Sequence, residues 1–225
     1  TREEQDAFAV ASQQKAAKAQ EEGRFANEIT PVAVFNRKTK SDDLKATDEF
    51  IRPNTTLESL AGLKPAFKKD GTVTAGNASG INDGAACVIM TTREYATELG
   101  LPILATLKGY AEAGVDPSIM GIGPVPAIQK LVARTRIPLD KVDVFELNEA
   151  FAAQSLAVIK DLKIPTEKVN PFGGAIALGH PIGASGTRIV VTLINALEQL
   201  DGKIGVASLC VGGGMGVAIA IEREN

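Results

Sequence analysis

Several scarcities in this sequence of 225 residues exclude whole classes of protein. Its two cysteines, Cys87 and Cys210, are too few for a disulfide scaffold, and their spacing matches no zinc site. No apolar run reaches the roughly 18 residues of a membrane-spanning helix, and the acidic, glutamine-rich start is unlike a signal peptide. The formal net charge of -3 argues against a nucleic-acid binder. We therefore expect a cytoplasmic protein with no nucleic-acid or membrane partner.

The chain does have enough apolar material for a core, since 44% of its residues are hydrophobic and 23% are charged. Its length fits one large domain or one and a half smaller ones. Thr1 and Glu4 have the spacing of a capping box for a helix that stops at Gly23. Because the sequence opens inside a capped helix and without methionine, we expect an upstream portion to have been removed.

The first third of the chain shows no pattern of a compact core. A strand is predicted over residues 29–35, and the stretch 36–54 is polar and aperiodic. A second capping pattern, Thr55 with Glu58, predicts a short helix before Pro65.

From Gly71 onward, glycine, alanine and β-branched residues become dense and the predicted elements alternate. Strands are predicted over residues 85–90, 103–110, 142–147 and 204–209, with a last strand that ends at 221. Helices are predicted over residues 92–99, 124–134, 149–162 and 186–200. A turn of three glycines at 212–214 joins the last two strands as a hairpin. This order indicates an α/β domain.

The only histidine, His180, lies in the run Gly179-His180-Pro181-Ile182-Gly183-Ala184-Ser185-Gly186. Flanking glycines let the backbone approach a ligand, and the following proline restricts His180 to an extended conformation. An imidazole with an ordinary pKa near 6.5 exchanges a proton readily at neutral pH. From position alone, a catalytic histidine and a structural loop histidine are equally supported. A phosphate-binding loop is disfavoured because no Gly-Lys-Ser/Thr follows.

The two cysteines have different settings. Cys210 ends a predicted strand and precedes three glycines, so its thiol would lie beside exposed backbone N–H groups, although such cysteines can also be inert. Cys87 lies inside the predicted strand 85–90, where a cysteine is usually a small buried hydrophobe, and we expect it in the core.

Asn148 stands at a predicted strand-to-helix junction, where asparagine often caps the first helical N–H groups. Taken alone, the capping interpretation is the better supported. Asn148, His180 and Cys210 are all expected at the carboxyl ends of strands, however, where open α/β sheets bind ligands. We therefore expect one cleft to hold all three.

Three segments match a known family in order and spacing: Asn148-Glu149-Ala150-Phe151, Gly179-His180-Pro181 and Cys210-Val211-Gly212-Gly213-Gly214 resemble the carboxyl-terminal signatures of thiolases. The similarity covers essentially the whole chain and is greatest to the bacterial acetyl-CoA acetyltransferases of that family. It implies reversible condensation of two acetyl-CoA molecules to acetoacetyl-CoA and CoA, or the reverse thiolysis. It also implies a dimer or tetramer and no cofactor, because the coenzyme A thioester is the substrate.

The resemblance further implies an α/β thiolase-like fold, layered α-β-α-β-α in the full protein. Residues 1–76 would be the remainder of the loop domain that covers coenzyme A. Residues 77–101 would be a strand and helix belonging to the amino-terminal half, and residues 102–225 the carboxyl-terminal half.

Catalytic roles are implied by the same signatures. In thiolases a cysteine of the amino-terminal half attacks the acyl group, a histidine activates it, and a second cysteine moves a proton at the substrate α-carbon. His180 and Cys210 match the last two roles. Asn148 would orient a water that helps to stabilise the enolate or thioester oxygen, and the N–H of Gly212 would serve a second oxyanion hole.

The implied substrate contacts are less specific, since an exposed arginine or a core aromatic residue explains several of them equally well. By resemblance, Arg52 lies at the adenine and phosphate end of coenzyme A, and Met120 lies near the acyl pocket. The other substrate-binding residues implied are Ser59 and Phe67 along the cover, Ser79 at the pantetheine, and Phe151.

One departure from the family is as informative as the match: no cysteine precedes Cys87, so nothing occupies the nucleophile's place. Covalent catalysis needs that thiolate, and we expect the chain alone to be inactive. Two alternatives stay open, a non-catalytic acyl-CoA-binding protein of thiolase fold and a fragment that persists only with its partner half. A ketoacyl synthase is disfavoured, because it usually pairs two histidines at its base site.

Overall fold

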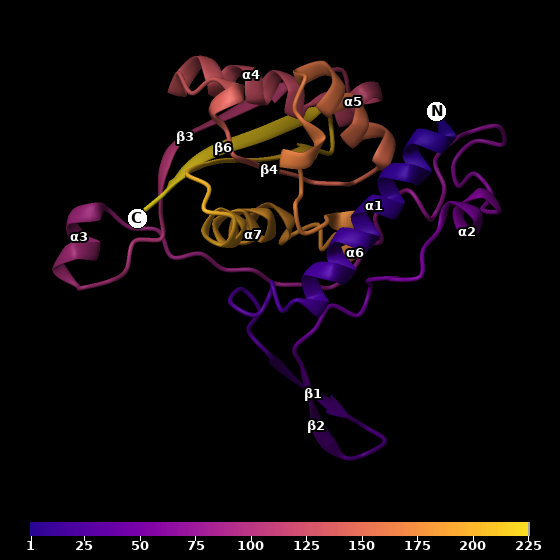
Figure 1. Cartoon of the computed structure of the whole chain (residues 1–225), viewed down its shortest axis with the longest axis horizontal. Helices are drawn as coiled ribbons and strands as arrows, with labels where there is room; N and C mark the ends of the chain where they lie inside the picture. Colours follow the sequence, from indigo (N-terminus) through magenta and orange to yellow (C-terminus); the bar gives the residue numbers. More distant parts are fainter. Residues whose placement is uncertain (225) are drawn as a thin grey trace.

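A four-stranded sheet lies at the centre of the computed structural model, which describes residues 1–224 (Figure 1). Its strand order is β3-β6-β5-β4, with parallel pairing only between β4 and β5. The bounds are β3 Ala105–Gly114, β4 Val144–Leu147, β5 Ile204–Val211 and β6 Met215–Arg223. The predicted hairpin is confirmed: β5 and β6 pair around a turn in which Gly213 and Gly214 have positive φ. Those φ values favour glycine, which has no Cβ to clash.

Helices cover both faces of this sheet, with α4 (Pro124–Thr135) and α5 (Ala152–Leu162) on one side and α7 (Ser185–Gln199) on the other (Figure 1). Each strand contributes side chains to the apolar core on either face of the sheet, since successive side chains point to opposite faces. On β4, Phe145 packs in the α4 and α5 core, whereas Val144 packs in the α7 core. The predicted α/β class is therefore confirmed.

The helix α7 shows why its residues form this element. Its buried apolar side chains recur at helical spacing, namely Ile189, Leu193, Ala196 and Leu197. The preceding Ser185 is also buried, at the first turn of the helix. This apolar stripe therefore determines how the beginning of α7 is oriented relative to the sheet, and with it the orientation of the residues before α7.

The first segment begins with α1 (Arg2–Glu21), and its predicted capping box between Thr1 and Glu4 is confirmed. The second capping signal was misplaced by one residue: α2 (Leu57–Ala61) is capped by Thr56, whose side chain accepts from the N–H of Ser59. A Ser at the third helical position supplies the reciprocal bond that the prediction assigned to Glu58.

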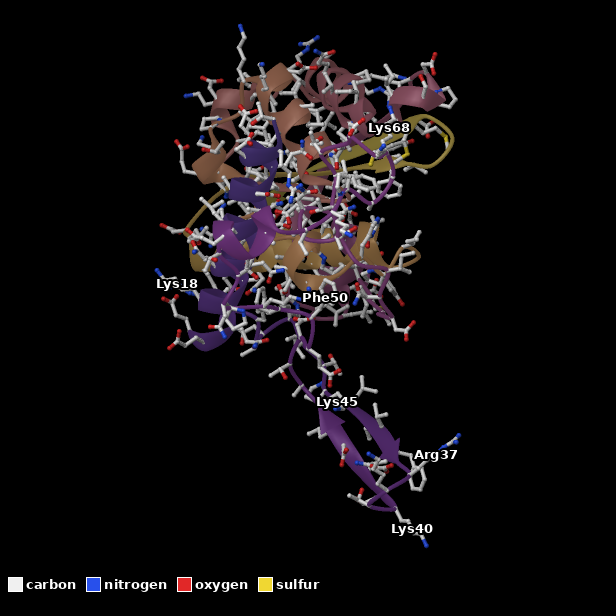
Figure 2. The ribbon with its side chains drawn as sticks, turned by 90° about the vertical axis from the view of Figure 1, so that its right-hand side faces the viewer. Lys18, Arg37, Lys40, Lys45, Phe50 and Lys68 are labelled. Atoms are coloured by element: carbon white, nitrogen blue, oxygen red, sulfur yellow. The ribbon has the colours of Figure 1, made fainter. Side chains whose placement is uncertain are left out.

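Between these helices an exposed hairpin projects from the body of the molecule, with Arg37 and Lys40 towards its tip (Figure 2). It consists of β1 (Val32–Asn36) and β2 (Ser41–Lys45). The prediction of a strand over residues 29–35 is confirmed in type and shifted by a few residues, whereas β2 was missed. Its sequence Ser-Asp-Asp-Leu-Lys has no apolar alternation, because the hairpin has no buried face.

The predicted strand 85–90 is wrong. These residues form no strand or helix, and Cys87, expected in the core, is exposed. An apolar run becomes a strand only where a neighbouring strand accepts its backbone hydrogen bonds, and residues 1–224 provide none beside it. The following helix, α3 (Arg93–Glu98), is confirmed with Thr92 as its cap, and it stands apart from the sheet (Figure 1).

Three of the predicted helices are present with small differences in their bounds. The helix predicted over residues 149–162 begins later than expected, at Ala152, while the helices at 124–134 and 186–200 are confirmed within two residues. The four short elements are the helix α6 (Ala175–Leu178) and the 3-10 turns η1 (Pro117–Ile122), η2 (Leu139–Lys141) and η3 (Thr166–Lys168). Among residues 1–224, no helix combines the length and hydrophobicity needed to cross a membrane.

Candidate active site

Asn148 follows the last residue of β4 and remains tied to the neighbouring strand. Its backbone N–H donates to the carbonyl of Ser208 on β5 at 3.0 Å, which places Asn148 beside the end of β5 where Cys210 lies. It does not cap α5, because that helix starts at Ala152 with Phe151 in the capping position and no side-chain cap. The capping interpretation of Asn148 is therefore wrong, and its amide is free for another role.

His180 lies between α6 and α7, and not at the carboxyl end of a strand as predicted. Its backbone N–H donates to the carbonyl of Gly80 at 3.0 Å and also contacts the Asn82 Oδ1 at 3.3 Å. The imidazole reaches the strand ends nevertheless: Asn148 Nδ2 lies 3.4 Å from His180 Nε2. The structure thus brings Asn148 and His180 into direct contact beside the end of the strand that carries Cys210.

The hydrogen bonds around Ser185 favour one assignment of the imidazole proton. The Ser185 hydroxyl donates to the Pro181 carbonyl at 3.0 Å, so its oxygen is left to accept from His180 Nδ1, 2.6 Å away. With the proton on Nδ1, the unprotonated Nε2 accepts from the Asn148 amide. The lone pair of a base therefore points toward Asn148.

Ser185→Ala tests this assignment of the proton. The variant removes the acceptor at Nδ1, so we expect the sole histidine to show a mixture of tautomers where the unaltered protein shows Nδ1–H. Long-range ¹H–¹⁵N correlation spectra measure the two populations directly. An Nδ1–H population that stays unchanged in Ser185→Ala contradicts the assignment, and Ser155→Ala, a buried serine on α5, serves as the matched control.

Burial sets the resting protonation states of the two acid/base candidates. Partial burial, and secondarily the positive charge of Arg188, lower the pKa of His180 below 6.5. Burial raises the pKa of the Cys210 thiol. At neutral pH the imidazole is thus unprotonated and the thiol protonated, which equips the site with one base and one acid.

A cleft of about 370 Å³ contains two of the predicted substrate-binding residues, Arg52 and Ser59. The Arg52 guanidinium lies over the Phe50 ring at 5.3 Å, and its backbone N–H donates to Gln13 Oε1 at 2.7 Å. The Ser59 hydroxyl is engaged in the cap of α2, donating to the Thr56 carbonyl at 2.8 Å. Arg52 therefore supplies the cationic group of this cleft.

The other predicted substrate residues lie outside the lining of this cleft. Phe67 is exposed and packs edge-on against Phe151, with 6.0 Å between ring centroids. The Ser79 hydroxyl donates to the Ala150 carbonyl at 3.1 Å, next to Phe151. Met120 lies in η1, which packs against β5 and α5. Phe67, Ser79 and Phe151 thus form one group around the segment that carries Asn148.

The last candidate, Gly212, lies in the exposed turn after β5, two residues beyond Cys210. A second hollow of about 390 Å³ lies beside His180, lined by residues 82–86 and 181–184. No cluster of three or more metal-ligating side chains occurs within residues 1–224.

Two buried polar residues beside the candidate site were missed in the sequence analysis. Ser185 lies five residues after His180, inside the glycine-rich run. When that run is interpreted as backbone turns, no role is assigned to the Ser185 hydroxyl, which contacts the imidazole. Glu149 lies next to Asn148 and is fully buried, whereas acidic residues are usually exposed. The signal available was its place in the short junction between β4 and α5, directly after the buried strand.

The fold and these contacts define an α/β protein with a candidate acid/base site where a histidine loop meets the ends of two parallel strands. The family described as "Thiolase, C-terminal domain" matches residues 101–223, and the one described as "Thiolase, N-terminal domain" matches residues 1–94. The chain belongs to the thiolase family.

Individual relatives agree with this. The chain is 57% identical over 224 residues to the acetyl-CoA acetyltransferase of Cupriavidus necator, a match that covers 100% of this chain and 57% of the relative. The crystal structure of the Bacillus anthracis acetyl-CoA acetyltransferase superposes with a TM-score of 0.97 at 52% identity, over 100% of this chain and 56% of that one. Human mitochondrial 3-ketoacyl-CoA thiolase gives a TM-score of 0.92 at 43% identity, with the same coverage of 100% and 56%. The chain thus spans little more than half the length of the relatives it matches.

Proposed function

We propose that this chain carries the acid/base part of an acetyl-CoA C-acetyltransferase. The reaction is the reversible Claisen condensation of two acetyl-CoA molecules to acetoacetyl-CoA and CoA, or thiolysis of a 3-ketoacyl-CoA. The observation that carries the proposal is the contact of 3.4 Å between His180 Nε2 and Asn148 Nδ2 in a chain of the thiolase family.

His180 acts as the general base that activates a nucleophilic thiol, and Cys210 exchanges a proton at the substrate α-carbon. Proton abstraction beside a thioester creates an oxyanion, which needs hydrogen-bond donors aimed at it. Asn148 and the N–H of Gly212 supply donors to that region. Asn148 Oδ1 is buried without a donor among the described residues, which favours a polar ligand at this amide.

The coenzyme A thioester lies across the cleft of Arg52 and Ser59, with the guanidinium near its phosphates. Phe67 and Phe151 flank the path toward the acyl group, with Ser79 at the pantetheine and Met120 near the acyl pocket. Because the thioester is the substrate, the reaction requires no further cofactor.

The nucleophile comes from a segment outside this sequence, the amino-terminal half of the thiolase. Residues 77–101 belong with that half in the proposal, while 1–76 cover coenzyme A and 102–225 form the carboxyl-terminal half. Support comes from the exposed apolar side chains of Ile81, Ile89 and Met90, which are 88%, 89% and 72% exposed. Exposed apolar side chains in such a run are typical of an interaction surface.

Activity in a chimeric protein tests the function. In this chimera, residues 1–225 replace the part of the Cupriavidus necator acetyl-CoA acetyltransferase that they match. We expect the chimera to cleave acetoacetyl-CoA in the presence of CoA, and the 225-residue chain alone to show no activity above background, because it lacks the thiolate. The absorbance of the thioester measures cleavage by the chimera and by the 225-residue chain.

Two results would contradict the proposal in different ways. Cleavage by the 225-residue chain alone shows that the nucleophile lies within it. A chimera that is folded and binds CoA but stays inactive favours a non-catalytic acyl-CoA-binding protein. Sedimentation of the chimera also tests the proposed dimer or tetramer, and fractionation of cells that contain the native protein tests its proposed cytoplasmic location.

A further inference from the structure

Glu149 is a buried carboxylate with a complete set of hydrogen-bond donors around it. It is 1% exposed, and its Oε2 accepts from the Ser12 hydroxyl at 2.6 Å and from the Ile176 backbone N–H at 3.2 Å. Its Oε1 accepts from Asn170 Nδ2 at 2.8 Å. The carboxylate therefore joins α1, the loop before α6, and α6 itself.

These donors lie close to both members of the Asn148–His180 contact. Glu149 directly follows Asn148, while Ile176 lies on α6, whose last residue is separated from His180 only by Gly179. A hydrogen bond between Glu149 and Ile176 thus connects the two segments that carry the amide and the imidazole, behind the place where their side chains meet.

Asn170 strengthens the connection from the other side. Its Oδ1 accepts from the Leu147 N–H at 2.8 Å, and its Nδ2 also donates to the Leu147 carbonyl at 2.9 Å. Together with the bond to Glu149, it therefore holds the residues immediately before and after Asn148. Asn170 thus contacts the backbone on one side of Asn148 and the side chain on the other.

We propose that Glu149 is the positioning residue of the site: its carboxylate holds the Asn148 amide against His180 Nε2 by tying the β4–α5 junction to α6 and α1. This inference rests on the proposed function only for its catalytic consequence. The positioning itself concerns only the geometry of the Asn148–His180 contact.

Only a carboxylate suits the surroundings, because every neighbour donates. The Ser12 oxygen already accepts from the Gly174 N–H at 3.1 Å, so the Ser12 hydroxyl proton is directed at Glu149. A Cβ on Gly174 would lie 2.3 Å from the Glu149 carboxyl carbon, so no side chain competes for this place. Glutamine at position 149 would turn an NH₂ group toward at least one of these donors.

A positive charge accompanies the buried carboxylate. Lys15 lies on the same helix as Ser12 and donates to the Val169 carbonyl at 2.9 Å. Burial lowers the pKa of Lys15, and the Glu149 charge opposes that shift more than any other group does. The segment from Val169 to Asn170 is thus held to α1 through Lys15 as well as through Glu149.

The sole histidine makes the positioning directly measurable in the 225-residue chain. Asn148→Ala should change the ¹⁵N shift of Nε2, because it removes the donor to that nitrogen. Glu149→Gln should shift the same signal in the same direction, and adding Glu149→Gln to Asn148→Ala should produce no further change. This readout does not depend on activity, so it stands or fails separately from the proposed function.

Three results would overturn the inference. The first is a Glu149→Gln variant whose Nε2 shift stays at its original value while Asn148→Ala moves it. The second is a double variant in which the two changes add. An Nε2 shift insensitive to Asn148→Ala also overturns it, since no contact would then exist for Glu149 to hold.

A milder pair of variants guards against loss of folding in Glu149→Gln. Ser12→Ala removes one donor to the carboxylate, so we expect a smaller Nε2 shift of the same sign. Ser155→Ala is the matched control, because Ser155 is equally buried and its hydroxyl has no hydrogen-bond partner among the described residues. Equal effects of the two serine variants contradict the role of Glu149.

In the active chimera the same logic predicts a kinetic signature. Glu149→Gln should lower kcat by about 10²-fold, the cost of misplacing a catalytic group by about 1 Å, with KM changed less than twofold. In the Asn148→Ala background it should lower kcat no further. A purely structural role would reduce kcat equally in both backgrounds, and that result also overturns the inference.

Discussion

Replacing His180 by alanine in the active chimera should reduce kcat by about a thousandfold, the range expected for loss of a general base. The imidazole is the only histidine side chain in residues 1–225, and its Nε2 faces the Asn148 amide. No neighbouring group described in the structure replaces it as a base, because burial holds Cys210 in its protonated form. Steady-state cleavage of acetoacetyl-CoA measures the effect.

The pH profile and chemical rescue make this prediction specific. Since the pKa of His180 is lowered, the acidic limb of kcat/KM should lie below pH 6.5, and it should disappear in His180→Ala. Added imidazole should restore part of the activity to the alanine variant but not to His180→Phe, which fills the space. A variant that keeps more than a tenth of the original kcat contradicts the role of His180 as base.

The carboxyl-terminal half could be predicted from the sequence because its patterns are local. The apolar stripe of α7 and the glycine turn between β5 and β6 each specify their own element, whatever lies around them. The strand predicted at 85–90 failed for the opposite reason. Its apolar side chains need a neighbouring strand and a covering layer, and neither is encoded within the segment itself.

Candidate site residues could be proposed from the sequence, but the contacts between them could not. Asn148, His180 and Cys210 could be named from the residues, while the placement of His180 at a strand end was wrong because it reaches the strands through its side chain. Glu149 and Ser185 act through hydrogen bonds to partners up to 137 positions away in the sequence, such as Ser12. Such contacts exist only after the fold has formed.

A second carboxylate near the site has a different environment from Glu149. Glu146 on β4 is fully buried, and its closest cationic atom is Arg188 Nη1 at 3.5 Å. Burial raises the pKa of Glu146 to about 8, despite the opposing charge of Arg188. At neutral pH the group is therefore mostly a protonated acid, and its contact with Arg188 is a long hydrogen bond more than an ion pair.

Glu146→Gln should therefore flatten the pH dependence of folding stability. Between the ordinary pKa of 4.5 and about 8, the folded chain holds a proton that the unfolded chain has released. The stabilisation that Glu146 contributes is fully present below pH 4.5 and is lost as pH rises through that window. The folding equilibrium constant falls by about tenfold per pH unit. Glutamine resembles the protonated acid and carries no such penalty.

Urea unfolding of the 225-residue chain at pH 5.5, 6.5 and 7.5 measures this difference. From pH 5.5 to 7.5 the folding equilibrium constant of the unaltered protein should fall about a hundredfold relative to that of Glu146→Gln. The reason is that unfolding releases about one proton from Glu146 at each pH in this range of two pH units. Glu167→Gln, at an exposed carboxylate in η3, should follow the unaltered protein throughout. If Glu146→Gln and the unaltered protein instead show parallel pH dependence, the carboxyl is ionised in the fold, and Arg188 stabilises its charge more strongly than burial opposes it.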